Sequence, residues 1–220
     1  MKKTLCLILA ILTLALCAVS CNEQPEQNTP PRIAPKADQI DMSTLETLDG
    51  VQICEEQTDY VLIEVADYGK ILVRLYPDVA PASVANFKKL VSQKFYDGLI
   101  FHRVIKNFMI QGGDPDGNGR GGSDENVYGE FAENGFENNL AHVRGVVAMA
   151  RSNDMNSASS QFYICHKTSG VTDLDGKYAT FGYVVYGMDV VDKIAKVNTN
   201  DNDKPLKNVV MTSVRFAKIG

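Results

Sequence analysis

The sequence predicts a mainly β domain, an antiparallel sheet closed into a barrel and capped at its ends by two α-helices. Short runs of β-branched and aromatic residues recur from about residue 60 to the C-terminus, separated by glycine, asparagine and aspartate. Only two stretches in this region place apolar residues at helical spacing, one early and one late. No internal repeat is visible.

The first elements of the domain are a predicted hairpin and a predicted helix. YVLIEV (60–65) and KILVRLY (70–76) are strand-like runs on either side of ADYG, which contains a turn glycine. The stretch YPDVAPASVANFKKLVSQ (76–93) is predicted to be helical, because Pro81 suits a first helical turn. The apolar residues that recur there at helical spacing are Val84, Phe87, Leu90 and Val91.

The rest of the domain is predicted to alternate short strands with loops. MDVVDKIAKV (188–197) has the pattern of a second helix, and KNVVMTSVRFAKIG (207–220) that of a closing strand. The strand-like runs before them are LIFHRVI (99–105), FMIQGG (108–113), GVVAMA (145–150), SQFYICH (160–166) and YATFGYVV (178–185).

Residues 1–20 have the pattern of an export signal. Lys2 and Lys3 precede the apolar run LCLILAILTLALCAV, which is shorter than a usual membrane-spanning helix. The next residues, AVSC (18–21), resemble the lipobox of bacterial lipoproteins, in which the cysteine is acylated, although Ala18 stands where leucine is usual. We therefore expect a lipid on Cys21. The alternative is an ordinary cleaved signal that leaves a cysteine behind.

Residues 21–58 are expected to form the lipidated cysteine and a flexible tether, and residues 59–220 the folded domain. The tether is polar and holds four of the chain's 8 prolines. Whether residues 43–58 are ordered against the domain stays open. Of the cysteines, Cys54 and Cys165 remain after export and lipidation, and they either pair or stay separate, because spacing alone does not choose.

Charge and motifs exclude several classes of function. A formal net charge of −5 offers no basic surface for nucleic acid. The loop 114–125 matches an EF-hand pattern, but a strand-like run precedes it and glycines follow it, so a glycine-rich surface loop is preferred. His102, His142 and His166 lack the spacing of metal ligands. There is no hydrolase nucleophile elbow and no phosphate-binding loop.

The segment FHRVIKNFMIQGGD contains an arginine among apolar residues. A guanidinium cannot lose its charge and is costly to bury without a partner. Strand alternation puts Arg103 on the same face as Ile105, and Gln161 on the same face as Tyr163. Together they predict a shallow groove with an apolar floor, amide donors and one permanent cation. The alternative is an arginine that pairs with an acid or lies at the barrel rim.

Three blocks resemble the cyclophilin family of peptidyl-prolyl cis-trans isomerases, and its bacterial exported branch in particular. They are FHRVIKNFMIQGGD, GVVAMARSNDMNSASSQFYI and LDGKYATFGYVVYGMDVVDKI, in the family's order. The resemblance covers about residues 60–220. It implies a closed eight-stranded antiparallel β-barrel with two capping helices. It also implies a prolyl isomerase that uses neither a metal nor an organic cofactor.

The resemblance implies roles for individual residues as well. Arg103 corresponds to the catalytic arginine. Within the substrate-binding set, four apolar or aromatic residues would receive the proline ring (Phe108, Met109, Tyr163, Leu174). Gln111 and Gln161 would bind the substrate backbone, and Ala150 and Arg151 would offer main-chain contacts. The substrate-binding set also includes His102 and Tyr178.

Four positions depart from the family's usual pattern. Asp173 stands where eukaryotic members often have tryptophan, so strong cyclosporin binding is not expected. Tyr178 replaces a frequent histidine, and Arg151 replaces an asparagine. Tyr163 replaces a phenylalanine and adds a hydroxyl group that needs a partner.

The function we expect is isomerisation of X-Pro bonds in exported or envelope proteins. The chain would be held by its lipid at the bacterial cell envelope, facing the periplasm or the exterior. Its expected partners are flexible proline-containing polypeptides and the membrane, with a monomeric domain and no nucleic acid. The alternative is a non-catalytic chaperone or scaffold that binds proline peptides in the same groove. A calcium-dependent interaction protein built on loop 114–125 is a more distant alternative.

Overall fold

One antiparallel sheet of nine strands forms the centre of residues 36–220, which the computed structural model describes. The predicted signal peptide, Cys21 and the tether up to residue 35 lie outside the described residues. Among the described residues, no helix is both long and apolar enough to cross a membrane. The strands are β1 (Val51–Cys54), β2 (Tyr60–Val65), β3 (Gly69–Leu75), β4 (Arg103–Ile105), β5 (Met109–Gly112), β6 (Val146–Met149), β7 (Phe162–Cys165), β8 (Thr180–Tyr186) and β9 (Met211–Ile219).

The strand order is β1-β9-β2-β3-β8-β6-β7-β5-β4. The prediction of a mainly β fold with two helices is confirmed, but the closed eight-stranded barrel is not. No ladder joins β4 to β1 in the described part of the chain. A bridge between Ile100 and Val210 links the residues before β4 to those before β9. β4 has three residues and pairs only with β5 in the described sheet, and β1 adds a ninth strand at the other end.

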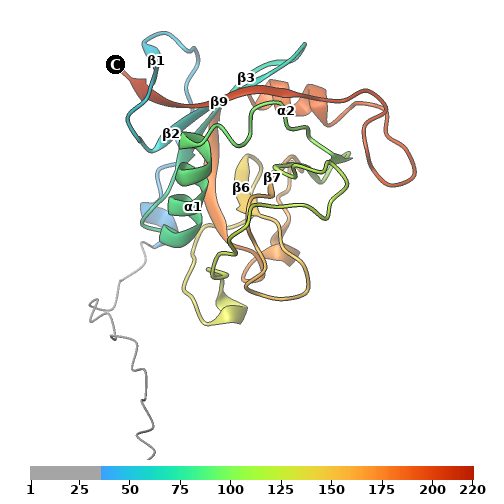
Figure 1. The fold of residues 1–220 in the computed structure, drawn as a ribbon. Coiled ribbons are helices and arrows are strands. Elements are labelled where there is room, and N and C mark those ends of the chain that lie inside the picture. The colour runs from blue at the N-terminus through green and yellow to red at the C-terminus, as the bar shows by residue number, and fades with distance from the viewer. Residues whose placement is uncertain (1–35) are drawn as a thin grey trace, which may run out of the picture. The chain divides into compact units, whose positions relative to one another are not determined.

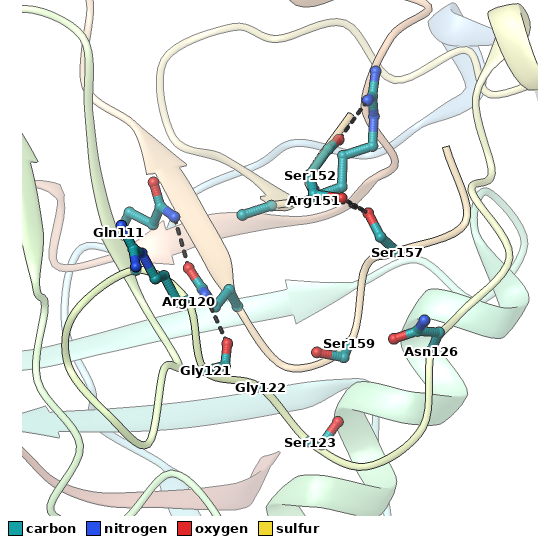
Figure 2. A pocket seen from close by; sticks show the side chains of 13 residues that line it. Gln111, Arg120, Gly121, Gly122, Ser123, Asn126, Arg151, Ser152, Ser157 and Ser159 are labelled. Carbon is teal, nitrogen blue, oxygen red and sulfur yellow. Dashed lines mark hydrogen bonds between the residues drawn. The ribbon is translucent and has the colours of Figure 1, made fainter. Parts of the chain in front are cut away.

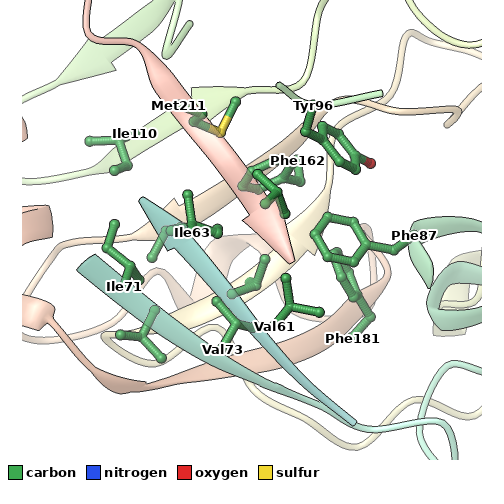
Figure 3. Packing of buried hydrophobic residues seen from close by; sticks show 14 of the residues in the cluster. Val61, Ile63, Ile71, Val73, Phe87, Tyr96, Ile110, Phe162, Phe181 and Met211 are labelled. Atoms are coloured by element: carbon green, nitrogen blue, oxygen red, sulfur yellow. The ribbon is translucent and has the colours of Figure 1, made fainter. Parts of the chain in front are cut away.

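The predicted hairpin forms as β2 and β3, with Tyr60 opposite Arg74 and Val65 opposite Gly69. Gly69 has a φ of 128°, a conformation that side chains rarely adopt. The apolar residues of both strands alternate, so one side of the hairpin enters the main core (Figure 3). The buried residues of the hairpin on this side are Val61, Ile63, Val65, Ile71, Val73 and Leu75.

Two α-helices lie against the sheet (Figure 1): α1 (Pro81–Ser92) packs on β9 and α2 (Met188–Ile194) on β3. The four apolar residues predicted for the buried face of α1 are all buried. Among them, Phe87 meets the ring of Phe162 edge to face, with centroids 5.6 Å apart. Three short 3-10 helices complete the structure: η1 (Ala37–Gln39), η2 (Ala132–Asn134) and η3 (Thr172–Leu174).

A distant carboxylate holds the start of α1. Ala80, the residue before the helix, makes no side-chain cap. Instead, the buried carboxylate of Glu130 accepts hydrogen bonds from the backbone N–H groups of Ala82 and Ser83, each at 2.8 Å, and from the Ser83 hydroxyl at 2.7 Å. These bonds satisfy N–H groups that have no partner inside a helix, and the negative charge lies at the positive end of the helix dipole.

The segment 36–58, which the sequence assigned to the tether, packs on the domain. Ile40 is buried with Tyr76 and Val79, and the N–H of Leu45 donates to Val185 O at 2.7 Å. β1 then pairs with the last residues of β9, from Val51 opposite Ile219 onward. The packed unit therefore begins before the boundary expected at residue 59. Residues 43–58, which the sequence left open, are ordered against it.

The two cysteines of the described residues are both free. Cys54 lies in β1, where its thiol donates to Glu56 O at 3.4 Å. Cys165 lies in β7, and burial raises the pKa of its thiol to about 12. Because β1 and β7 are far apart in the strand order, the structure selects the unpaired alternative.

Candidate active site

A row of residues crosses four neighbouring strands on one face of the sheet. Arg103 in β4 lies opposite Gln111 in β5, Gln111 lies opposite Tyr163 in β7, and Tyr163 lies opposite Ala148 in β6. Directly opposite residues in an antiparallel pair point to the same side of the sheet. The register therefore places a cation, an amide and an aromatic ring side by side, on β4, β5 and β7, starting at the β4 edge of the sheet.

This row borders a hollow of about 150 Å³. Met109 and Tyr163 are buried at its base, and they belong to a small apolar cluster that is separate from the main core. Phe162, the neighbour of Tyr163, points the other way into the main core, as strand alternation predicts. Nine residues line the hollow, and all nine were candidates from the sequence: Arg103, Phe108, Met109, Gln111, Ala150, Arg151, Tyr163, Leu174 and Tyr178.

The guanidinium of Arg103 is accessible, with 44% of the side chain exposed. Its Nε lies 3.4 Å from Asp203 Oδ2, on a loop beside β4. Neither terminal nitrogen, Nη1 or Nη2, has a hydrogen-bond partner among residues 36–220. An ion pair between two exposed groups at this distance contributes little. The fork of Arg103 is therefore free to bind a molecule in the hollow.

Two amides connect this hollow to a larger one beside it. Gln111 Nε2 donates to Gln161 Oε1 at 2.8 Å, and Gln161 Nε2 donates to Gly121 O at 2.8 Å (Figure 2). The larger hollow has a volume of about 540 Å³ and lies over the glycine-rich loop. Gln161 lines this second hollow and not the first. The chain of hydrogen bonds fixes both amides at the boundary between the two hollows.

Arg151 lies at the same boundary but does not present a free cation. Its guanidinium lies 4.7 Å from the centre of the Tyr178 ring and 5.1 Å from that of Phe131. It also donates to Lys177 O through Nε and Nη2, at 3.1 and 3.0 Å. Ala150, the preceding residue, donates its N–H to Gln161 O at 2.9 Å. Arg151 therefore packs on Tyr178 and stabilises this side of the hollow.

His102 is the candidate that the structure places elsewhere. Its ring is buried, does not line the hollow, and has no hydrogen-bond partner for either nitrogen within the described part of the chain. Burial lowers its pKa. Next to Arg103 in the chain, it points to the opposite side because side chains alternate in extended backbone. The structure therefore places the ring of His102 outside the lining of this hollow, and a substrate contact by His102 stays a prediction.

The glycine-rich loop 114–125 folds around its own first carboxylate. Burial alone would raise the pKa of Asp114, but N–H donors from Asp116, Gly119 and Asn118 outweigh burial and lower it. Glu125, the last residue of the EF-hand pattern, pairs with Lys89 on α1 at 2.7 Å. No group of three or more His, Cys, Asp or Glu residues is placed to hold a metal ion among residues 36–220. The loop is a carboxylate-centred turn.

Three residues near the hollow were missed by sequence reasoning. Asp203 lies beside Arg103, and His142 and Asp175 lie behind Tyr163. The only indication of them in the sequence was the hydroxyl of Tyr163, which needed a hydrogen-bond partner. Its partner is His142 Nε2, at 2.9 Å.

Comparison with known proteins identifies the family. Residues 60–216 match the family model described as cyclophilin type peptidyl-prolyl cis-trans isomerase/CLD. Peptidyl-prolyl cis-trans isomerase cypE of Dictyostelium discoideum is 48% identical over 143 residues, which is 64% of this chain and 87% of that protein. Peptidyl-prolyl cis-trans isomerase ppi1 of Schizosaccharomyces pombe is 43% identical over 141 residues, 63% of this chain and 87% of that protein.

Among solved structures, a cyclophilin type peptidyl-prolyl cis-trans isomerase of Cryptosporidium parvum, crystallised in the presence of the dipeptide Ala-Pro, is similar to this chain. Its TM-score is 0.62 at 30% sequence identity, over 71% of this chain and 97% of that one. The family match covers most of the described residues, and the relatives are matched over most of their length. The chain therefore belongs to the cyclophilin-type peptidyl-prolyl cis-trans isomerases.

Proposed function

We propose that the hollow binds the proline ring of a flexible polypeptide and that Arg103 accelerates rotation about the preceding X-Pro bond. The observation that carries this proposal is a guanidinium whose terminal nitrogens have no partner among residues 36–220, beside a small hollow with Met109 and Tyr163 at its base. The relative crystallised with Ala-Pro supports a proline-containing ligand for this fold.

The chemistry requires no covalent partner. Rotation about an X-Pro amide costs about 20 kcal/mol because the twisted bond loses its resonance. In the twisted state the proline nitrogen becomes pyramidal and gains a basic lone pair. A guanidinium directed at that nitrogen stabilises the twisted amide more than the planar one, which is the condition for catalysis. Arg103 is suited to this because its charge is permanent and its donors form a planar fork.

The arginine cannot supply the whole effect. An acceleration of about 10⁵ requires about 7 kcal/mol of barrier reduction. One charge-assisted hydrogen bond contributes about 1.5 to 3 kcal/mol. We assign the rest to the apolar base of the hollow, which excludes water from the imide, and to Gln111 and Gln161, which hold the substrate backbone in place.

The test is a cis/trans exchange measurement on a short X-Pro peptide by NMR. Arg103→Ala is expected to lower the exchange rate by two or more orders of magnitude with an unchanged thermal midpoint, because the side chain is exposed. Lys207→Ala is the control, since Lys207 is another exposed cation paired with an exposed acid, Asp67, away from the hollow. Near-normal exchange with Arg103→Ala would refute the assignment.

The alternative function is a non-catalytic proline-peptide chaperone or scaffold. Both functions use the same hollow, so binding alone does not separate them. If wild type binds the peptide but leaves its exchange rate at the uncatalysed value, the binding function replaces the isomerase. The free fork of Arg103 favours catalysis, because binding a planar proline does not need a cation at the imide.

We also propose that the chain is exported and held by a lipid on Cys21 at the bacterial cell envelope, facing the periplasm or the exterior. The support is the sequence: a basic start, an apolar run and AVSC. The domain would act there as a monomer on exported chains. In a bacterial host, labelled palmitate should enter the wild type and Cys17→Ser but not Cys21→Ser. A wild type without label would refute the anchor.

A further inference from the structure

We propose that His142 is a positioning residue for prolyl isomerisation: together with Asp175 it holds the hydroxyl of Tyr163, and thereby the aromatic base of the proline hollow. This inference rests on the proposed function for its activity readout. Nothing in the chemistry of the isomerisation itself requires an imidazole here, so the proposal depends on the geometry behind the hollow.

The three side chains form one continuous chain of hydrogen bonds. His142 Nδ1 lies 2.8 Å from Asp175 Oδ1, and His142 Nε2 lies 2.9 Å from the hydroxyl of Tyr163. The imidazole is 1% exposed, and its ring lies nearly parallel to that of Tyr163, with an interplanar angle of 13° and ring centres 6.1 Å apart. The ring of Tyr178, which lines the hollow, meets both of them edge to face.

The direction of each hydrogen bond follows from the charges. Burial lowers the pKa of His142, although the carboxylate of Asp175 acts to raise it, so the ring is neutral at pH 7. A carboxylate only accepts, so Nδ1 carries the proton and donates to Asp175. Nε2 is then an acceptor, and the hydroxyl of Tyr163 donates to it. The hydroxyl hydrogen therefore points away from the hollow.

The backbone of His142 joins the base of the hollow to its wall. Its N–H donates to Asp175 Oδ1 at 2.7 Å, and its carbonyl accepts from the N–H of Val171 at 2.7 Å. Val171 and Asp175 flank η3, and Leu174 in η3 lines the hollow. A single residue thus fixes the distance between the Tyr163 ring on β7 and the wall that carries Leu174.

Loss of the imidazole has a specific consequence for the substrate. Tyr163 is buried, so a hydroxyl without a partner would seek a new one. The open side of the ring is the hollow, and a rotated hydroxyl or a water molecule bound to it would occupy the space of the proline ring. A phenylalanine ring has no hydroxyl and would need no hydrogen-bond partner. The effect of losing His142 should therefore depend on whether residue 163 carries a hydroxyl.

The experiment measures cis/trans exchange and peptide affinity by NMR for the full chain, purified in detergent, with Ala-Pro-containing peptide as the probe. His142→Asn retains a donor near Asp175 but cannot reach Tyr163, and should lower kcat/KM about ten-fold. Tyr163→Phe, which keeps the ring and removes only the hydroxyl, sets the reference level for the double variant. The double variant should return to the level of Tyr163→Phe. Such a rescue distinguishes positioning of the hydroxyl from general support of the loop.

Matched controls are available in the same chain. His166→Asn makes the same substitution at another histidine beside a carboxylate, Asp192 at 3.0 Å, and Tyr96→Phe removes another buried tyrosine hydroxyl. Both should leave kcat/KM within two-fold of wild type. Long-range ¹⁵N NMR of the wild type, which needs no variant to fold, should show His142 protonated on Nδ1 only.

Three results would overturn the inference. The first is an unchanged kcat/KM in His142→Asn. The second is a double variant that falls as far below Tyr163→Phe as His142→Asn falls below wild type. The third is a proton on Nε2 of His142 in the wild type. An inactive wild type that still binds the peptide refutes the isomerase itself. The tautomer and peptide affinities then still decide whether His142 shapes the hollow for binding.

Discussion

At the scale of single residues, the site depends on the shape of Arg103 as well as on its charge. Within the described residues the two terminal nitrogens of the fork have no partners, so they can contact the imide nitrogen and a neighbouring carbonyl together. Lysine offers a more strongly hydrated point charge on a flexible stem. Arg103→Lys should therefore lower kcat/KM about 10- to 100-fold in the NMR exchange assay, between wild type and Arg103→Ala. Activity within two-fold of wild type would show that charge alone is sufficient.

Single residues also show why part of the site escapes sequence reasoning. The nine lining residues were found because they fall in three blocks that resemble one family. His102 was assigned to the same substrate-binding set, but strand alternation turns its ring to the other side, where it is buried. His142 and Asp175 reach Tyr163 from loops 21 and 12 residues away, and only the folded chain brings them together. The sequence showed that the hydroxyl required a partner, but it did not identify that partner.

At the scale of elements, the position of α1 depends on a carboxylate from outside the helix. Glu130→Gln keeps the shape but replaces an acceptor oxygen by an amide that competes with the N–H groups of Ala82 and Ser83. We expect the free energy of unfolding to fall by about 1 to 3 kcal/mol. Glu125→Gln, on an exposed partner of the same helix, should change it by less than about 0.5 kcal/mol. Urea unfolding measures both, and equal effects would rule out the capping role.

Elements with a long periodic pattern were predictable, and short ones were not. The hairpin and α1 carry enough residues for their period to be read, and both form where expected. β1 has four residues, half of them exposed, and it forms because β9 offers an unpaired edge. Whether a sheet closes into a barrel depends in the same way on pairing between residues far apart in sequence. Such partners do not appear in a local pattern.

At the scale of the whole molecule, two buried histidines make stability depend on pH. Burial lowers the pKa of both His102 and His142 below the ordinary value of 6.5. Asp114 and Asp175 oppose this shift, and Lys204 and Arg103 reinforce it at His102. Both rings should titrate below pH 6.5 in an NMR titration of the folded chain. A ring that titrates at or above that value is not buried as described.

The sign of the effect follows from where the protons bind. Below pH 6.5 the unfolded chain takes up a proton on each histidine, while the folded chain does not until the pH reaches its lower pKa. The stabilisation is therefore complete above pH 6.5 and is lost as the pH falls below it. Each histidine contributes a slope of at most about 1.4 kcal/mol per pH unit. Urea unfolding between pH 7.5 and 5 should show a falling free energy of unfolding, and the double variant His102→Gln/His142→Gln should flatten it. An equally steep slope in that variant would assign the acid sensitivity to the carboxylates.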